Sequence, residues 1–202
     1  MRKLLQILLF AAFAGTALAQ DVAPDVLVRN TTQEVLGLIK QDKDLRSGRK
    51  LLDLVDAKVL PHFNFTRMTM LAVGRPWRDA NPAQQQTLTR EFRTLLVRTY
   101  STALELYKNQ TIDVRALAAQ PGDTDVVVKT AINQPGGQPI PMDYRMEKTP
   151  QGWKVFDVKV GGVSLISTYR EDFAGQVRDA GIDGLIKVLT SKNRQLESRA
   201  KS

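Results

Sequence analysis

The sequence predicts an α+β fold, a four-stranded antiparallel sheet with helices packed on one face. Apolar residues recur at helical spacing before residue 108 and after residue 164, whereas the period changes to two between residues 111 and 160. Short clusters rich in proline and glycine separate the strand-like runs, and such short turns join antiparallel neighbours. One block of antiparallel strands flanked by helices is typical of the α+β class.

Four helical segments are predicted before the sheet. Each carries apolar residues on one face, and Pro61 ends the second of them because proline interrupts a helix. The segments are residues 25–40, 48–60, 63–73 and 82–108.

The helix that follows Asn81 is the most strongly marked. Asn81 is a favourable N-cap, Pro82 suits the first helical position, and Gln84 is placed to complete a capping box. From Phe92 to Tyr107, apolar side chains follow the i, i+3, i+4, i+7 pattern. The sequence therefore predicts one apolar stripe along this helix.

The strands are predicted over residues 111–118, 124–132, 139–148 and 152–160. In the third strand Met142, Tyr144 and Met146 share one face, opposite Asp143 and Arg145, so the sheet is expected to have one wet face there. The last run loses the alternation, which predicts a strand covered on both sides, with Trp153 and Val155 on one and Phe156, Val158 and Val160 on the other.

Helical structure is predicted again after the sheet, which ends at the glycine pair 161–162. Ser164 is placed to cap a helix that runs to Ala180, and Gly181 is placed as its C-cap. A last helix follows, and the polar tail from Lys192 is expected to fray.

Residues 1–19 have the layout of a secretory signal peptide. Arg2 and Lys3 precede an apolar run, and a small-x-small triplet ends at Ala19. The apolar run is shorter than the roughly 18 residues that a spanning helix needs. The sequence therefore predicts cleavage after Ala19 and a single exported domain over residues 20–202, most simply in a bacterial periplasm.

The composition excludes several classes of site. The 202 residues carry a net charge of +8 and include no cysteine and one histidine, His62. A disulfide scaffold, a thiolate nucleophile and a cysteine-based metal site are therefore ruled out. His62 is interpreted as structural or surface-exposed, and no local motif supports a Ser–Lys pair. No catalytic residue, metal site or cofactor is predicted.

Two further patterns, a glycine pair and an acidic group, do not match known ligand-binding motifs. The glycine pair 161–162 belongs to neither phosphate-binding glycine motif. The acidic group near the N-terminus lacks the glycine and terminal glutamate of an EF-hand loop; its members are Asp21, Asp25, Asp42 and Asp44.

The C-terminal segment is basic, with Lys187, Lys192, Arg194, Arg199 and Lys201. Such a segment binds phosphates by counterion release, or it is a solvated helix end that suits the helix dipole. The solvated end is the simpler interpretation. An exported protein is not expected to meet nucleic acid, so an anionic lipid surface or a partner protein is the remaining alternative.

The methionines form a pattern of their own. Apart from the initiator, all four lie in the 63–73 segment or on one face of the third strand: Met68, Met70, Met142 and Met146. Methionine adapts its shape to apolar ligands, although filling of the core is the simpler interpretation. Periodicity leaves both open.

An ordered set of segments, spread over most of the chain, carries a resemblance to a known family. The segments are Val59 to Phe65, Met68 to Met70, Gly74 with Trp77, Gln84 to Gln86, Phe92 to Tyr100, Asp143 to Arg145, Gly152 to Val158, Gly162 to Ile166 with Tyr169, Arg170 and Phe173, and Gly181 to Ile186. Together they resemble the MlaC family, periplasmic phospholipid-binding proteins of the Mla pathway that are also called toluene-tolerance proteins. Asn64 departs from the family pattern, which often has aspartate there.

The resemblance implies a carrier and not an enzyme. Family members hold phospholipid tails in an apolar cleft between helices and sheet. They carry lipid between an outer-membrane lipoprotein complex and the substrate-binding component of an inner-membrane ABC transporter, which preserves outer-membrane lipid asymmetry. Phospholipid is then cargo rather than cofactor, and the carrier is expected to be a monomer. An exposed acyl chain costs about 0.8 kcal/mol per CH₂ in water, so such cargo needs an apolar cover.

The cleft implied by the resemblance is expected between the Met142 face of the sheet and three helical regions, the 63–73 segment, the 82–108 stripe and the helix after Ser164. The residues predicted to bind lipid are Phe63, Phe65, Met68, Met70, Leu71, Leu96, Tyr100, Leu104, Val128, Met142, Tyr144, Met146, Val155, Val163, Ile166 and Tyr169.

Two other functions stay open. A small α+β enzyme with a cavity would need a titratable group inside it, such as Asp143 or Tyr144, and the alternation places Asp143 on the face away from Met142. A protein-binding adaptor would instead have a packed core without a void. A search for a cavity distinguishes the adaptor from the carrier.

Overall fold

The structure is a computed structural model that describes residues 22–105, 110–117, 120 and 122–201. The predicted signal peptide and its cleavage after Ala19 lie outside these residues. Within the described part of the chain, no helix combines the length and the apolar character that crossing a membrane requires.

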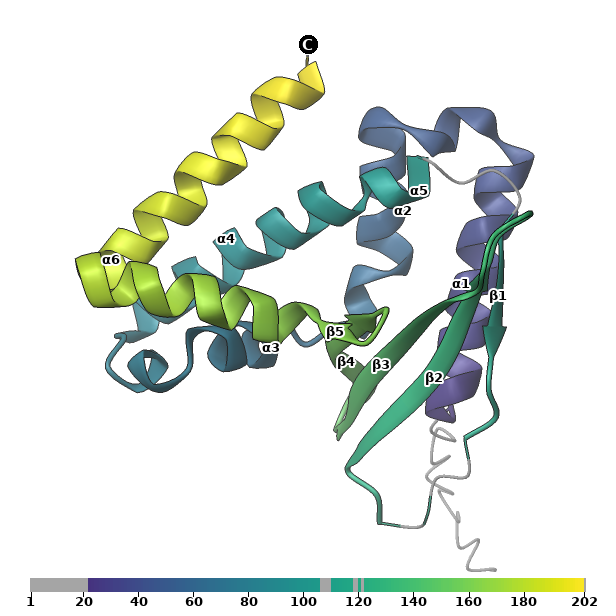
Figure 1. The fold of residues 1–202 in the computed structure, drawn as a ribbon, viewed down its shortest axis with the longest axis horizontal. Helices are drawn as coiled ribbons and strands as arrows, with labels where there is room; N and C mark the ends of the chain where they lie inside the picture. The colour runs from purple at the N-terminus through teal and green to yellow at the C-terminus, as the bar shows by residue number, and fades with distance from the viewer. Residues whose placement is uncertain (1–21, 106–109, 118–119, 121, 202) are drawn as a thin grey trace, which may run out of the picture.

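The chain runs through helices, then a sheet, then a long helix (Figure 1). The helices are α1 (Pro24–Gln41), α2 (Gly48–Lys58), α3 (Phe65–Val73), α4 (Pro82–Tyr100), α5 (Thr102–Glu105) and α6 (Leu165–Lys201), with short 3-10 turns η1 (Lys43–Arg46), η2 (Leu60–His62) and η3 (Arg75–Arg78). The strands are β1 (Thr111–Val114), β2 (Asp125–Asn133), β3 (Ile140–Thr149), β4 (Gly152–Val160) and β5 (Val163–Ser164). The predicted α+β class is confirmed.

The sheet is an antiparallel meander in the order β1-β2-β3-β4-β5. The prediction of four strands was wrong by one, because the chain turns back after β4 and pairs Val163 with Val160. Gly161 and Gly162 have φ angles of 59° and 87°, the conformation that a tight two-residue hairpin turn requires. The glycine pair, predicted to end the sheet, therefore forms a hairpin.

A β-bulge changes the faces of β4. The register of β3 and β4 shifts between Arg145 and Met146, so Val155 pairs with Met146 and Val158 pairs with Tyr144. Val155 and Val158 therefore pack in the same cluster, whereas Phe156 packs in a different one. The prediction that β4 is covered on both faces is confirmed, but the placement of Val158 opposite Val155 was wrong. One inserted residue reverses the alternation that follows it.

The helix after Asn81 begins as predicted. The Asn81 side chain accepts a hydrogen bond from the Gln84 amide at 2.9 Å, and the Gln84 side chain accepts one from the Asn81 amide at 3.0 Å. Helix α4 ends at Tyr100 and α5 follows, so the single helix predicted to residue 108 is interrupted. Residues 106–108 lie outside the described part.

Replacement of Asn81 by alanine removes one half of this capping box. We expect Asn81→Ala to lower the free energy of unfolding by about 1 kcal/mol, the usual cost of a lost N-cap. Urea denaturation followed by circular dichroism measures the change. Asn81→Ser is the matched control, because serine caps as well as asparagine and should leave the midpoint nearly unchanged. Equal losses in both variants would contradict the assignment.

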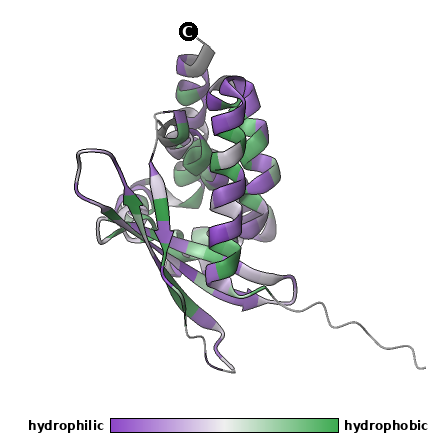
Figure 2. Ribbon diagram, turned by 90° about the vertical axis from the view of Figure 1, so that its right-hand side faces the viewer, coloured by the Kyte–Doolittle hydropathy of each residue, from purple (hydrophilic) through white to green (hydrophobic). Residues whose placement is uncertain are grey.

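Three apolar clusters divide the interior. The first joins α3, α4 and α6 around Phe92, and it includes Phe156 of β4. The second lies on the inner face of the sheet, around Val128 and Met146, and contacts α1 through Val28. The third packs α1 against α2. Figure 2 shows the resulting layers, with the sheet on one side and helices gathered on the other.

Helix α6 is broken at Gly181, whose φ of 67° and ψ of −171° are not helical. The predicted stop at this glycine is confirmed. The expectation of a fraying tail from Lys192 was wrong, since α6 continues to Lys201 and Asn193 is buried. The Asn193 amide donates hydrogen bonds to the Glu91 backbone and side chain at 2.9 and 3.0 Å, which fix the tail to α4.

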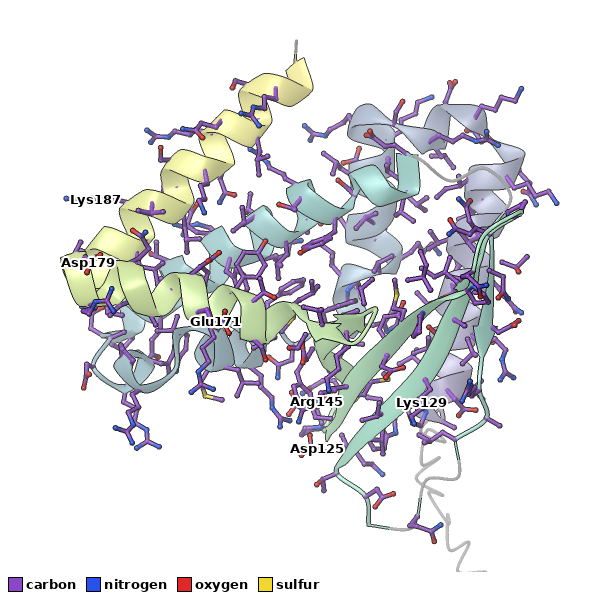
Figure 3. The ribbon with its side chains drawn as sticks, viewed as in Figure 1. Asp125, Lys129, Arg145, Glu171, Asp179 and Lys187 are labelled. Atoms are coloured by element: carbon purple, nitrogen blue, oxygen red, sulfur yellow. The ribbon has the colours of Figure 1, made fainter. Side chains whose placement is uncertain are left out.

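The outer face of the sheet is charged. Asp125 and Lys129 on β2 and Arg145 on β3, labelled in Figure 3, share this face with Glu147. Arg67 of α3 donates to Asp125 at 2.9 Å and to Glu147 at 2.6 Å. These ion pairs attach α3 to the ends of β2 and β3 on the outer face, opposite the apolar face.

Candidate functional site

An apolar cleft of about 520 Å³ lies between α1 and the inner face of the sheet. Of the described residues that line it, none is Asp, Glu, Lys or Arg. The lining consists of Leu27, Val28, Thr31, Thr32, Val35 and Leu36 of α1, Val59, His62 and Phe63 next to α3, Leu104 of α5, and Gln110, Ile112, Ile132, Gln134, Ile140, Met142, Tyr144, Met146 and Val155 from the sheet and its ends.

The sheet side of the cleft follows from strand alternation and register. Ile112 pairs with Ile132, and Ile132 pairs with Ile140, so three isoleucines from three strands form a row. Farther along β3, Met142 and Tyr144 point to the same face because side chains two residues apart share a face. The alternation of β3 thus builds a continuous apolar wall.

The helical side is the broad face of α1. Its lining residues come in adjacent pairs, and the pairs Leu27–Val28 and Val35–Leu36 lie about two helical turns apart. Two threonines, Thr31 and Thr32, occupy the middle turn between these pairs. Because this face of α1 is wide, it can form one wall of a cleft whose other wall is the sheet, without direct packing of the two walls along their whole length.

Polar contacts at one edge attach α1 to the sheet. The Arg29 guanidinium donates to the Val114 carbonyl at 3.1 Å, and the Leu117 amide donates to the buried carboxylate of Asp25 at 3.4 Å. Both partners lie on or just after the edge strand β1. These bonds position α1 over the sheet without filling the space between them.

The chain between α2 and α3 closes the other edge. Phe63 forms a parallel bridge with Val155, and the Asn64 amide donates to the Val155 carbonyl at 2.8 Å. The Asn64 side chain accepts from the Arg67 amide at 3.0 Å and donates to Glu147 at 2.8 Å. An aspartate at this position would lack that donor and would face Glu147 with a like charge, which gives asparagine a physical role here.

Two titratable side chains line the cleft. Burial raises the pKa of Tyr144 to about 12, so its hydroxyl is neutral at physiological pH. Burial, together with the charge of Lys154, lowers the pKa of His62, which favours the neutral imidazole. The cleft is therefore uncharged at neutral pH. Within the described part of the chain, no group of three or more His, Cys, Asp or Glu side chains is placed to hold a metal ion.

The structure brings part of the predicted lipid-binding set to this cleft. These residues come from η2 and its flank, α5, β3 and β4, and they are Phe63, Leu104, Met142, Tyr144, Met146 and Val155. Met146 lines the cleft although its side chain is fully buried from solvent.

The other predicted residues lie away from the cleft. Six belong to or pack against the cluster between α3, α4 and α6: Phe65, Met68, Leu71, Leu96, Ile166 and Tyr169. Val128 is fully buried in the sheet cluster, and Met70, Tyr100 and Val163 are exposed. The three helical regions predicted to face the sheet across the cleft instead pack against one another, and the side chains of Phe92, Tyr169 and Phe173 pack edge to face or tilted there.

The sequence reasoning missed the contribution of α1 to the cleft. The segment 25–40 was predicted to be a helix with one apolar face, but it was not among the helical regions predicted to enclose the cleft. The width of the stripe, with adjacent apolar pairs at Leu27–Val28 and Val35–Leu36, was the available indication.

Comparisons with known proteins agree with this architecture. The family model described as "MlaC protein" matches residues 29–191. The toluene tolerance protein ttg2D of Pseudomonas putida is 29% identical over 183 residues, which cover 88% of this chain and 83% of that protein. The intermembrane phospholipid transport system binding protein MlaC of Haemophilus influenzae is 26% identical over 177 residues, 85% of this chain and 82% of that protein.

A solved structure is also similar. The phospholipid-binding protein from Ralstonia solanacearum, determined in complex with a phospholipid, is 41% identical, with a TM-score of 0.80. The match covers 87% of this chain and 99% of that one. Since the family model matches residues 29–191, well over half of the sequence, the chain belongs to the MlaC family.

Proposed function

We propose that this protein is a periplasmic carrier that holds phospholipid acyl chains in the cleft between α1 and the sheet and moves lipid between the outer and inner membranes. The observation that carries the proposal is the uncharged, mostly apolar lining of a space of about 520 Å³. Ligand sites commonly enclose about 300–1,000 Å³. Burying ten CH₂ groups would contribute about 8 kcal/mol at the usual value per group.

The relatives support the same cargo. The similar structure from Ralstonia solanacearum contains a phospholipid, and the relative from Haemophilus influenzae is named for phospholipid transport. In this chain we assign acyl-chain contacts to Phe63, Leu104, Met142, Tyr144, Met146 and Val155 together with the α1 residues of the cleft lining. The predicted residues that lie among α3, α4 and α6 stabilise the fold instead.

The site suits a carrier better than an enzyme or an adaptor. A neutral tyrosine and a neutral histidine in an apolar space provide no nucleophile with a positioned base. An adaptor with a packed core would have no such space. The carrier works as a monomer after signal-peptide cleavage, with residues 20–202 as one domain, and exchanges lipid with an outer-membrane lipoprotein complex and the substrate-binding component of an inner-membrane ABC transporter.

Native mass spectrometry of the mature protein purified from periplasm tests the proposal. We expect a mass excess of one phospholipid, and solvent extraction should recover that lipid and identify it. The delipidated protein should regain the mass excess after incubation with phosphatidylglycerol and phosphatidylethanolamine vesicles. A bare polypeptide mass both before and after incubation would reject the carrier and favour the adaptor.

A further inference from the structure

Tyr144 places a hydroxyl group in the middle of the apolar wall of the cleft. Its strand neighbours in register are Val128 on β2 and Val158 on β4. Val128 is fully buried and Val158 is 7% exposed, so the Tyr144 ring lies between two buried aliphatic side chains of the neighbouring strands. A phenylalanine would supply the same apolar surface, which leaves the hydroxyl to be explained.

The hydroxyl has a weak partner in the structure. It donates a hydrogen bond to the Met142 sulfur at 2.9 Å, and both side chains line the cleft. A thioether sulfur is a poor acceptor compared with a carbonyl oxygen. Where bound acyl chains exclude water, a neutral O–H group gains from exchanging sulfur for a stronger acceptor.

The chemistry of the cargo limits what that acceptor is. Acyl chains are hydrocarbon and accept no hydrogen bond, whereas the ester carbonyl oxygens are the polar atoms covalently closest to the chains. The other polar lining groups lie elsewhere: His62 is on η2, Thr31 and Thr32 are on α1, Gln110 precedes β1, and Gln134 follows the end of β2. Tyr144 is the polar side chain on the central strand of the wall.

We propose that the Tyr144 hydroxyl donates a hydrogen bond to an ester carbonyl oxygen of the bound phospholipid, so that the cleft distinguishes ester-linked from ether-linked lipids. This inference rests on the proposed carrier function. The hydroxyl leaves the Met142 sulfur when lipid enters and returns to it when lipid leaves. Tyr144 is thus a specificity-determining residue that recognises how the chains are linked, independently of the head group.

Binding of two synthetic phosphatidylglycerols to the delipidated protein tests the inference. The two lipids have the same head group and saturated sixteen-carbon chains, attached by ester bonds in one and by ether bonds in the other. We expect the native protein to bind the ester lipid about fivefold more tightly, the effect of one net hydrogen bond. Tyr144→Phe should bind both lipids with equal affinity.

Tyr169→Phe is the matched control, since Tyr169 is a partly buried tyrosine that packs in the cluster between α3, α4 and α6. It should keep the fivefold preference. An equal affinity of the native protein for both lipids, or a preference that survives in Tyr144→Phe, would overturn the inference and leave the carrier function standing. Failure of the native protein to bind either lipid would reject both.

An infrared measurement avoids dependence on the variant. With a carbonyl-¹³C-labelled ester lipid bound to the native protein, we expect one ester band at lower wavenumber than in a hydrocarbon solvent, as hydrogen bonding produces. Bands that all match the hydrocarbon value would overturn the inference even if Tyr144→Phe fails to fold.

Discussion

A glutamate in place of Ile132 is expected to weaken phospholipid binding by at least about 100-fold, since effective desolvation of a charge costs several kcal/mol and each 1.4 kcal/mol is tenfold. Ile132 is the central member of the isoleucine row that lines the cleft, paired with Ile112 and Ile140. A carboxylate there would have to lose its water when acyl chains enter. Titration with phosphatidylglycerol at pH 8, where the carboxylate is ionised, measures the loss.

Val127→Glu is the control for this variant. Val127 lies on the same strand as Ile132 but an odd number of residues away, so it occupies the outer face, and it is 40% exposed. Lipid binding should stay within about twofold of the native value, because an exposed substitution away from the site changes little. Similar losses in both variants would place the lipid somewhere other than this cleft.

Local chemistry explains why much of the fold could be predicted. The capping box at Asn81 and the stop at Gly181 each depend on residues adjacent in sequence, and the structure has both. The hairpin at Gly161 was harder to predict. Two glycines after a strand favour a tight turn, but only the pairing of Val160 with Val163 shows that another strand follows. Features determined by neighbouring residues are visible in the sequence, whereas pairing partners are less so.

The cleft also shows that the sequence predicts local features better than the partners that pack against them. The alternation of Met142, Tyr144 and Met146 predicted one wall correctly, because strand period two assigns a face without knowledge of the partner. The opposite wall depends on which helix covers that face. The stripe of α4 and the start of α6 are also apolar, but they pack together around Phe92. Periodicity shows that a face is buried and not what buries it.

The bulge at Phe156 illustrates a second reason for error. Its ring packs with α3, α4 and α6, while Val155, its neighbour, packs toward the cleft. The Arg67 and Arg145 guanidinium groups lie 3.7 and 4.8 Å from the Phe156 ring centroid. The lost alternation correctly indicated burial on both sides, but the position of the extra residue depends on contacts from α3 that lie far away in sequence.

Replacement of Asp157 by alanine is expected to lower the free energy of unfolding by about 3 kcal/mol, since hydrogen bonds to a charged group contribute about 1.5–3 kcal/mol. The Asp157 carboxylate is 2% exposed and accepts from the Ser164 hydroxyl at 2.8 Å and from the Ile166 amide at 3.2 Å. It thereby caps the N-terminus of α6, where a negative charge is favourable. Denaturant unfolding measures the change, with Asp157→Asn expected to lose less.

Asp179→Ala provides the comparison that separates burial from charge. Asp179 also lies on α6 and pairs with Arg178 at 3.2 Å, but its side chain is 68% exposed, so its loss should cost less than about 0.5 kcal/mol. Equal effects of the two variants would mean that the Asp157 bonds do not connect sheet and helix. A large effect of Asp157→Ala alone would show that β4 holds α6 through this carboxylate. The same strand supplies Val155 to the cleft, so the attachment of α6 and one wall of the cleft then depend on residues two positions apart in β4.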